Sequence, residues 1–434
     1  MNEMTREKDV GGEILVKRFI GAVALSGAMT MGAQAAAPAV ITMDGAYLEI
    51  ARGRIAEKAP ELQPAYAKLI GDANAALSMK AESVTYKKIT PPSGDMHDYM
   101  SLAPYWWPDP AKPDGLPYIQ KDGQFNPSSK NGDTDSVRMQ LMCLGAQTLS
   151  LAYYFSGDVK YAKKTAEVIR TWFLDPKTRM NPNLRYGQAV MGRVDGRGIG
   201  LIDTRNMWMV IDAVQLIQPS GELSAAEVSQ MKTWFREFAN WMLTSDTGIE
   251  EFNAHNNHGT FYDMQVANYA LFYGDKDLAK RTVERGVDLR IASQISIEGK
   301  QYAELERTTP FHYSAFNLDA MTNIARYGEQ AGVKVWTTRA KTRGLRNGID
   351  YMVPFSNGSQ PWPYKELKEA ETELMLPVLL RAERAYKGGN YAAAAAALPV
   401  RTLNTQENIA FSKTLGVEQP TTVNSVDRLI WPVK

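Results

Sequence analysis

Residue types that hold metals or act as thiol nucleophiles are scarce in this sequence. Its 434 residues include one cysteine and four histidines. The lone Cys143 lies in an apolar helical pattern, so an intrachain disulfide is excluded and a small core residue is a better interpretation than a nucleophile. Because imidazole is so rare here, the segments where it gathers are candidate sites.

The chain also lacks a net charge. Its 49 basic and 48 acidic residues leave a formal charge of +1. This balance argues against the broad basic surface of nucleic-acid-binding proteins. An anionic ligand would therefore have to be recognised by a local cluster of donors.

No apolar run in the N-terminal region is long enough for a membrane span. The run Phe19–Met31 is short and rich in Gly and Ala. Lys17-Arg18 precedes it, and Ala33-Gln34-Ala35 follows it as a small-x-small cleavage site. We therefore predict an export signal over residues 1–35, cleaved near Ala35, and a periplasmic or secreted protein.

Alternating strand patterns are scarce as well, and helical periodicity dominates. Segments 151–165 and 269–282 resemble each other: each has an apolar helix end, a Gly-Asp turn and a new helix with a basic outer face. A capping box, Ser224–Glu227, starts another helix. Further helical runs are predicted at 44–80, 204–217, 260–273, 276–293, 312–329, 335–352 and 365–387.

Repeated helical hairpins predict an all-α fold. We expect one domain over residues 36–434, an (α/α) toroid or incomplete barrel of about six or seven hairpins. In a toroid the loops at one end converge on a single cleft, so polar and aromatic loops are expected to line it.

Residues 83–132 interrupt the helical pattern with many Pro, Gly, Asp and Asn residues. Their aromatic content indicates an ordered loop, and aromatic faces stack on sugars or nucleobases. The alternative is a packed Ω-loop with a structural tryptophan. Just after this loop, Arg138 is equally suited to bind a substrate carboxylate or to pair with Asp135. The candidate contacts in the loop are His97, Tyr99, Tyr105, Trp106 and Trp107.

Two of the four histidines lie in Asn253–Thr260, directly before a predicted helix. Backbone N–H groups and the helix dipole favour an anion there, and Asn256, Asn257 and His258 add donors. The alternative is an elaborate N-cap with a hydrogen-bonded histidine. A metal bound by His255 and His258 is a further alternative, but no nearby residue completes a known ligand spacing, so we expect no metal.

A second cluster covers Glu304–Ser314. His312 and Tyr313 fall on the first turn of a helix, and Arg307 lies in the loop before it. A tyrosine with a pKa of about 10 acts as a base only if that pKa is lowered, which a neighbouring arginine does. The alternative is a core tyrosine whose neighbour Arg307 pairs with Glu304 or Glu306.

Together these segments resemble the alginate lyase superfamily of polysaccharide lyases. The matching pieces are His97–Pro110, Pro113–Tyr118 with Asp122-Gly123, Asn256–His258 and Arg307–Tyr313. The resemblance implies an (α/α) toroid that cleaves a uronic-acid polymer, such as alginate or glucuronan, by β-elimination. It also implies that Asn257 and His258 neutralise the uronate carboxylate, and that Arg307 and Tyr313 act as a pair. The chain departs from the family pattern in Gly259-Thr260 and in the six-residue spacing from Arg307 to Tyr313.

The implied chemistry is reasonable by itself. The C5 proton of a uronate is weakly acidic, and neutralising the adjacent carboxylate stabilises the enolate-like transition state. We expect Tyr313 to remove that proton and to protonate the departing O4, while Asn257, His258 and Arg307 hold the carboxylate. No cofactor is expected. The remaining candidates for substrate binding are His97, Tyr99, Tyr105, Trp106, Trp107, Arg138, His255, Asn256, Glu304 and His312.

Two other functions compete with this one. A glycoside hydrolase needs two carboxylates beside the scissile bond, which Asp133, Asp135, Glu304 and Glu306 are candidates to supply. A non-catalytic periplasmic polysaccharide-binding protein needs the aromatic loop but no base. In all three cases the expected partner is an anionic polysaccharide and not a nucleic acid.

Overall fold

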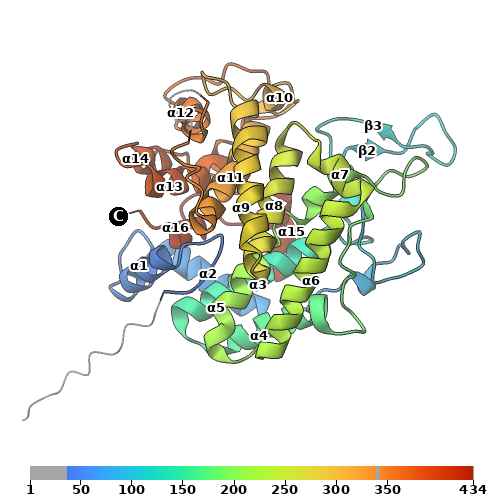
Figure 1. Ribbon diagram of the computed structural model, residues 1–434, viewed down its shortest axis with the longest axis horizontal. Coiled ribbons are helices and arrows are strands. Elements are labelled where there is room, and N and C mark those ends of the chain that lie inside the picture. Colours follow the sequence, from blue (N-terminus) through green and yellow to red (C-terminus); the bar gives the residue numbers. More distant parts are fainter. Residues whose placement is uncertain (1–36, 339–342, 434) are drawn as a thin grey trace, which may run out of the picture. The chain divides into compact units, whose positions relative to one another are not determined.

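Helices dominate the computed structural model, which describes residues 37–338 and 343–433 (Figure 1). The predicted export signal lies outside these residues, and the described residues belong to one compact unit. None of the described helices is both long and apolar enough to cross a membrane. The longer helices are α1 (Gly45–Ala56), α2 (Gln63–Ala76), α3 (Ser136–Ser156), α4 (Val159–Ile169), α5 (Trp208–Ile217), α6 (Ala225–Thr244), α7 (Asp246–Phe252), α8 (Asn257–Tyr273), α9 (Lys276–Gly286), α11 (Pro310–Ala331), α12 (Leu345–Ser356), α13 (Leu376–Ala385) and α15 (Gln406–Leu415). Shorter helices are α10 (Tyr302–Leu305), α14 (Tyr391–Ala396) and α16 (Asp427–Ile430).

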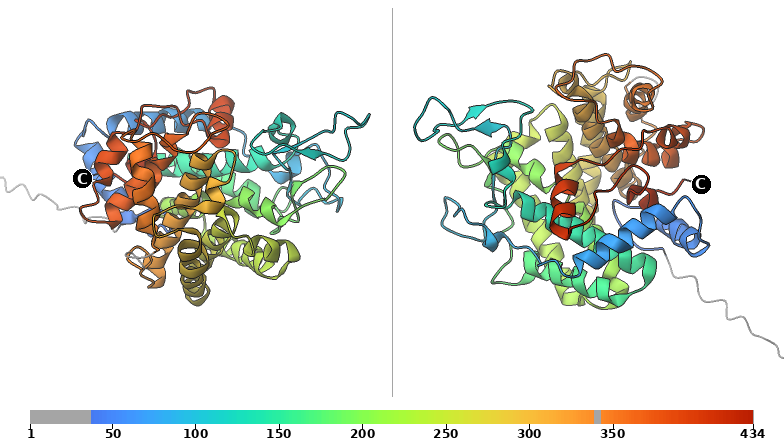
Figure 2. Two further views of the ribbon diagram at one scale, coloured as in Figure 1. Left: turned by 90° about the horizontal axis from the view of Figure 1, so that it is seen from above. Right: turned by 180° about the vertical axis from the view of Figure 1, so that it is seen from behind.

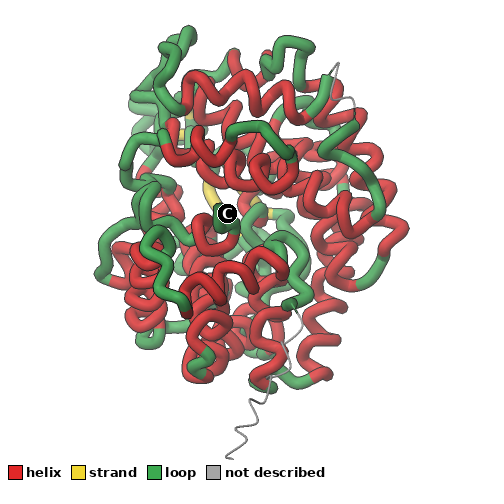
Figure 3. The backbone as a smooth tube through the Cα atoms, turned by 90° about the vertical axis from the view of Figure 1, so that its left-hand side faces the viewer, coloured by secondary structure: helices red, strands yellow, loops and turns green. Residues whose placement is uncertain are grey.

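The inner helices form a ring. Along it, α2 packs on α3, α3 on α5, α5 on α8, α8 on α11 and α11 on α13. The short helix α16 contacts both α13 and α2 and thereby closes the ring. Helices α4, α6, α9 and α12 lie outside it, and Figures 2 and 3 show the layers from other sides. The predicted helical toroid is confirmed.

The sequence distinguishes inner from outer helices. Helix α8 buries residues around its whole circumference, as expected for a helix enclosed by others, whereas α4 and α9 bury one stripe each. The two Gly-Asp turns have the predicted structure. Gly157 and Gly274 adopt positive φ at the helix ends, and the next aspartate in each turn caps α4 or α9. The capping box at Ser224 is also present at the start of α6.

Several predicted helix boundaries are wrong. The run 44–80 is two helices, and residues 198–204 form a 3₁₀-helix before α5. Helix α12 starts only at Leu345, because Gly332 ends α11 and the Trp336 ring is buried against Tyr386 instead of continuing a helix. Likewise α13 begins at Leu376, not at 365. Before it, Glu366 accepts a hydrogen bond from the backbone N–H of Phe311, which ties this segment to the start of α11.

The loop over 83–132 is ordered by two small sheets. Strand β1 (Met100–Leu102) pairs in parallel with β4 (Tyr186–Ala189), and β2 (Trp106–Trp107) pairs antiparallel with β3 (Ile119–Gln120). Figure 1 shows the β2–β3 hairpin at the upper right of the view. These short pairings hold the aromatic segment over one end of the ring.

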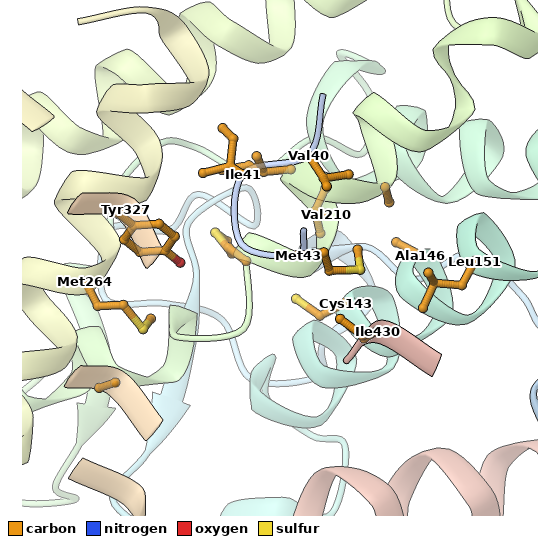
Figure 4. Packing of buried hydrophobic residues seen from close by; sticks show 14 of the residues in the cluster. Val40, Ile41, Met43, Cys143, Ala146, Leu151, Val210, Met264, Tyr327 and Ile430 are labelled. Atoms are coloured by element: carbon orange, nitrogen blue, oxygen red, sulfur yellow. The ribbon is translucent and has the colours of Figure 1, made fainter. Parts of the chain in front are cut away.

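Residues 40–43, which precede α1, run into the opposite end of the ring. Val40, Ile41 and Met43 are buried among side chains of α3, α5, α11 and α16 (Figure 4). The backbone N–H groups of residues 41–43 donate to the fully buried carboxylate of Asp212. Cys143 lies in the same core as a free, buried thiol, as its apolar pattern predicts.

Candidate active site

A cavity of about 1240 Å³ opens where the inner helices α8, α11 and α13 begin. The loop containing β2 and the segment around α15 also line it. Eight residues singled out in the sequence lie on its wall although they are far apart in the chain. They are Tyr105, Trp106, Asn256, Asn257, His258, Arg307, His312 and Tyr313.

Tyr313 lies on the first turn of α11, which Pro310 starts. The Tyr313 side chain is buried except for a small exposed part, and its hydroxyl is 2.9 Å from the hydroxyl of Tyr105. Arg307 donates a hydrogen bond of 2.8 Å to the Tyr313 oxygen, and its guanidinium carbon lies 3.8 Å from the centre of the tyrosine ring. Arg307 is held in turn by Asp122, at 2.9 Å, and not by Glu304 or Glu306. Among these neighbours of the Tyr313 hydroxyl, Arg307 is the group that stabilises a phenolate.

The expected lowering of the Tyr313 pKa does not occur. Burial raises this pKa well above its usual value of 10, and the neighbouring Tyr105 raises it further. The positive charge of Arg307 lowers it, but by less than burial raises it. Tyr313 is therefore protonated at neutral pH, and the prediction of a lowered pKa was wrong.

The Asn256–His258 segment forms the start of α8. Asn256 is the N-cap, and its side-chain oxygen accepts from the backbone N–H of His258 at 3.1 Å. Asn257 donates to both oxygens of Glu304, from its backbone N–H at 2.6 Å and from Nδ2 at 2.7 Å. Since Glu304 is buried, it fixes the orientation of the Asn257 amide from behind.

His258 is supported in the same way by a second buried carboxylate. Its Nδ1 lies 2.9 Å from Oε1 of Glu251, which is 1% exposed. A carboxylate only accepts hydrogen bonds, so Nδ1 carries the hydrogen and Nε2 is left free for a ligand. His312 is similar: its Nδ1 lies 2.6 Å from Glu371. Burial raises the pKa of Glu371, but the hydrogen bonds and charge interactions with His312 and Lys368 together outweigh burial and bring it to about 2.

Arg290 secures the loop before α8. Its buried guanidinium donates to the carbonyls of Phe252 and Ala254, and its Nε donates to Asp263 at 2.8 Å. Gly259 leaves the space that this arginine occupies, because a Cβ at position 259 would overlap Arg290 and the Ala254 carbonyl. The Asn257-His258 pair therefore rests on a rigid support.

Three residues predicted to bind substrate are instead built into the fold. Tyr99 is fully buried, and its hydroxyl donates to Asp203 at 2.9 Å. Arg138 pairs with Glu82 and donates to two backbone carbonyls, so it does not form the ion pair with Asp135 that was one alternative. Glu304 lies behind Asn257 and does not reach the cavity.

Three further candidates lie away from the cavity wall. His97 is hydrogen-bonded through Nδ1 to the carbonyl of Arg179, at 2.6 Å. Trp107 donates to the Gln124 carbonyl, and Lys121 lies over its ring. His255 is exposed outside the cavity. The structure therefore does not support substrate contacts for these three residues.

The carboxylates considered for a hydrolase do not form a catalytic pair. None of Asp133, Asp135, Glu304 and Glu306 lines the cavity. Asp135 is buried against Lys87 at 3.0 Å, and burial raises its pKa to about 7. Within residues 37–338 and 343–433, no group of three His, Cys, Asp or Glu side chains is placed to hold a metal.

Several residues of the cavity wall were not predicted from the sequence. Gln188, Arg197, Arg205 and the segment 403–408 line it. Among them, Arg197 has a local signal, since it stands between Gly196 and Gly198. The others are brought to the cavity by contacts between distant parts of the chain.

Comparisons with known proteins agree with this geometry. The family model for alginate lyases matches residues 83–362. An alginate lyase from Bacteroides ovatus is 36% identical, covers 92% of this chain and 100% of its own, and superposes with a TM-score of 0.82. Alginate lyase A1-III from Sphingomonas species A1 is 14% identical over 89% of this chain and 98% of its own, with a TM-score of 0.55, which shows a shared fold. A search of curated proteins found no match.

Fold and matches together define a polysaccharide lyase built on a helical toroid. Within that class, the chain belongs to the alginate lyase family.

Proposed function

We propose that the protein cleaves alginate, or a closely related uronic-acid polymer such as glucuronan, by β-elimination, with Tyr313 as base and acid. One observation carries this proposal: the Tyr313 hydroxyl, contacted by Arg307 and Tyr105, lines the same cavity as Asn257 and His258. The substrate is suggested by the relatives, which are described as alginate lyases, one of them complexed with a tetrasaccharide. The mature enzyme is also proposed to act in the periplasm or outside the cell, as the N-terminal sequence predicts.

The proposed reaction begins with the uronate carboxylate in contact with Nε2 of His258, the remaining amide N–H of Asn257, and Arg307. These donors stabilise the charge that develops as the C5–H bond breaks. Tyr313 first releases its hydroxyl proton to solvent, and Arg307 stabilises the phenolate that results. The C5 proton then moves to that phenolate, and the electron pair of the C5–H bond forms the C4=C5 double bond. The C4–O4 bond breaks, and O4 takes the proton back from Tyr313, which regenerates the phenolate.

The raised pKa of Tyr313 favours its role as the acid and opposes its role as the base, so the base step depends on stabilisation of the phenolate. A neutral tyrosine is a competent acid for O4, and the phenolate is a strong base once it forms. Arg307 stabilises that phenolate by a hydrogen bond and by its charge.

The test is to replace Tyr313 by Phe and to measure the ultraviolet absorbance of the unsaturated product. The substrates are alginate, polymannuronate, polyguluronate, glucuronan and hyaluronan. We expect the wild type to produce the conjugated product from at least one uronan, and Y313F to be slower by about 10³-fold or more. The control is Y302F, because Tyr302 is 57% exposed on α10.

The outcomes separate the three functions considered. Full activity of Y313F would contradict the role of Tyr313. Shortened chains without the ultraviolet band would indicate hydrolysis, and binding without any cleavage would indicate a binding protein.

A further inference from the structure

Most positive side chains on the cavity wall are already paired with carboxylates. The pairs are Lys68–Asp72, Arg205–Glu407, Arg307–Asp122, Lys368–Glu371 and Arg381–Asp319. Lys130 donates to Ser136, and its charge acts on Glu407. Arg197 differs, because no carboxylate of the described residues lies within ion-pair distance of it.

Arg197 is held by uncharged oxygens of one residue. Its Nε donates to the Gln188 carbonyl at 3.0 Å, and its Nη2 donates to the Gln188 side-chain oxygen at 3.3 Å. The Nη1 group donates to none of the described groups. Burial lowers the pKa of Arg197, but an arginine stays charged at neutral pH. The carboxylates of Glu250, Asp203 and Glu251 act on Arg197 only from beyond ion-pair distance. A partly buried guanidinium without an ion-pair partner is a candidate site for an anionic ligand.

The support behind Arg197 is rigid. Gln188 has a φ of +51°, a conformation that is uncommon for residues other than glycine. Its Nε2 donates to Asp203 at 3.1 Å, so the side-chain oxygen must face Arg197. Asp203 is fixed in turn by the hydroxyls of Tyr99 and Ser101, at 2.9 and 2.5 Å. Local strain supported by a buried network is typical of functional sites.

An aromatic surface lies beside this cation. The guanidinium carbon of Arg197 is 5.9 Å from the centre of the Trp106 ring, and both residues line the cavity. The preceding residue, Tyr105, is hydrogen-bonded to Tyr313. Trp106 therefore directly follows a residue that contacts the proposed catalytic group, and Trp106 and Arg197 line the same cavity as that group.

We propose that Arg197 and Trp106 form a second uronate-binding subsite. In it, Arg197 binds the carboxylate of the sugar next to the one that is cleaved, and the Trp106 ring covers the face of that sugar. An arginine and an aromatic ring suit this ligand, because guanidinium binds carboxylate and the ring stacks on C–H surfaces. This inference rests on the proposed function.

The experiment measures the binding of an alginate tetrasaccharide by calorimetry in the Y313F background, where cleavage does not interfere. Adding R197Q is expected to weaken binding by about tenfold or more, because a charge-assisted hydrogen bond is lost. It should also make the affinity less dependent on salt. The matched control is R193Q. The guanidinium of Arg193 lies 5.3 Å from the same Trp106 ring, but its side chain does not line the cavity. We expect R193Q to bind within about twofold of the parent.

Thermal unfolding shows whether each variant is folded. If R197Q does not fold, R197K replaces it. Lysine keeps the positive charge but lacks the two-pronged guanidinium, so the affinity for the tetrasaccharide should fall by about threefold or more. Parent-like affinity of the folded variant would overturn the subsite. If the Y313F parent binds the tetrasaccharide and the wild type cleaves alginate, a parent-like affinity of the Arg197 variant refutes the subsite but leaves the proposed function intact. If the wild type neither binds nor cleaves any uronan, the proposed function fails and the subsite fails with it.

Discussion

The two ends of the inner helices use polar residues in opposite ways. Where α8 and α11 begin, Asn257, His258 and Tyr313 face a cavity. Further along the same helices, Asn268 and Arg326 face residues 40–43 and donate hydrogen bonds to them. One pair of helices thus carries a candidate active site at one end and a closed core at the other.

The difference lies in what satisfies the polar groups. At the closed end the chain supplies its own partners: Asp212 receives three backbone N–H groups, and Arg326 donates to the carbonyls of Thr42 and Met43. At the cavity end, Glu251 and Glu304 hold the active-site side chains from behind and leave their other atoms to a ligand. Substitutions at the closed end should therefore lower mainly stability, and substitutions at the cavity end should lower mainly activity.

The largest effect is expected at the closed end. Asp212→Ala leaves three buried backbone N–H groups unpaired and should lower the free energy of unfolding by roughly 3–5 kcal/mol. Urea unfolding followed by circular dichroism measures this loss. Asp277→Ala, at an exposed position of α9, is the control. If D212A unfolds like the wild type, residues 40–43 do not stabilise the ring.

A smaller effect is expected at the cavity end, and there activity should fall more than stability. Glu304→Gln cannot accept from both N–H groups of Asn257, so the amide loses its fixed orientation. We expect kcat/KM on the preferred uronan to fall by about 10- to 100-fold, with less change in stability than for D212A. Glu306→Gln, two residues away and exposed, is the matched control. Equal losses in the two variants would show that Glu304 does not position Asn257.

The smallest effect is expected on the outer helix α6, which belongs to neither end of the inner helices. A substitution there shows how much an ordinary surface ion pair contributes to stability. The hydrogen bond from Arg170 lowers the pKa of Glu227 from 4.5 to about 2. A carboxyl with a lowered pKa stabilises the fold above pH 4.5, and this contribution is lost as pH falls towards 2. Glu227→Gln should therefore cost about 1 kcal/mol at pH 7 and nothing near pH 2, with activity unchanged. A stability difference that persists at pH 2 would contradict the assignment.

Local signals in the sequence were sufficient for the helix starts and turns. Asn256, the capping box at Ser224 and the Gly-Asp turns act through neighbours a few residues away. Their geometry follows from short-range hydrogen bonds, so it could be predicted. Tyr313 was also predicted on a first turn, and Pro310 starts that helix in the structure.

Contacts between distant residues could not be predicted. Tyr99 and Trp106 belong to the same aromatic loop. Tyr99 is buried in the core, where its hydroxyl donates to Asp203, whereas Trp106 lines the cavity. Arg138 is paired with Glu82 across 56 positions, and no spacing rule indicates that partner. The pKa of Tyr313 depends on burial, which a sequence does not report.

Gly259 has a consequence for how the family diverges. The glycine and Arg290 occupy one space, so neither can change alone without disturbing the loop before α8. We expect the two positions to change together among related lyases, with a larger residue after the Asn-His pair wherever the arginine is absent. The residue that follows the Asn-His pair would then sort these sequences into groups that support the same chemistry in different ways.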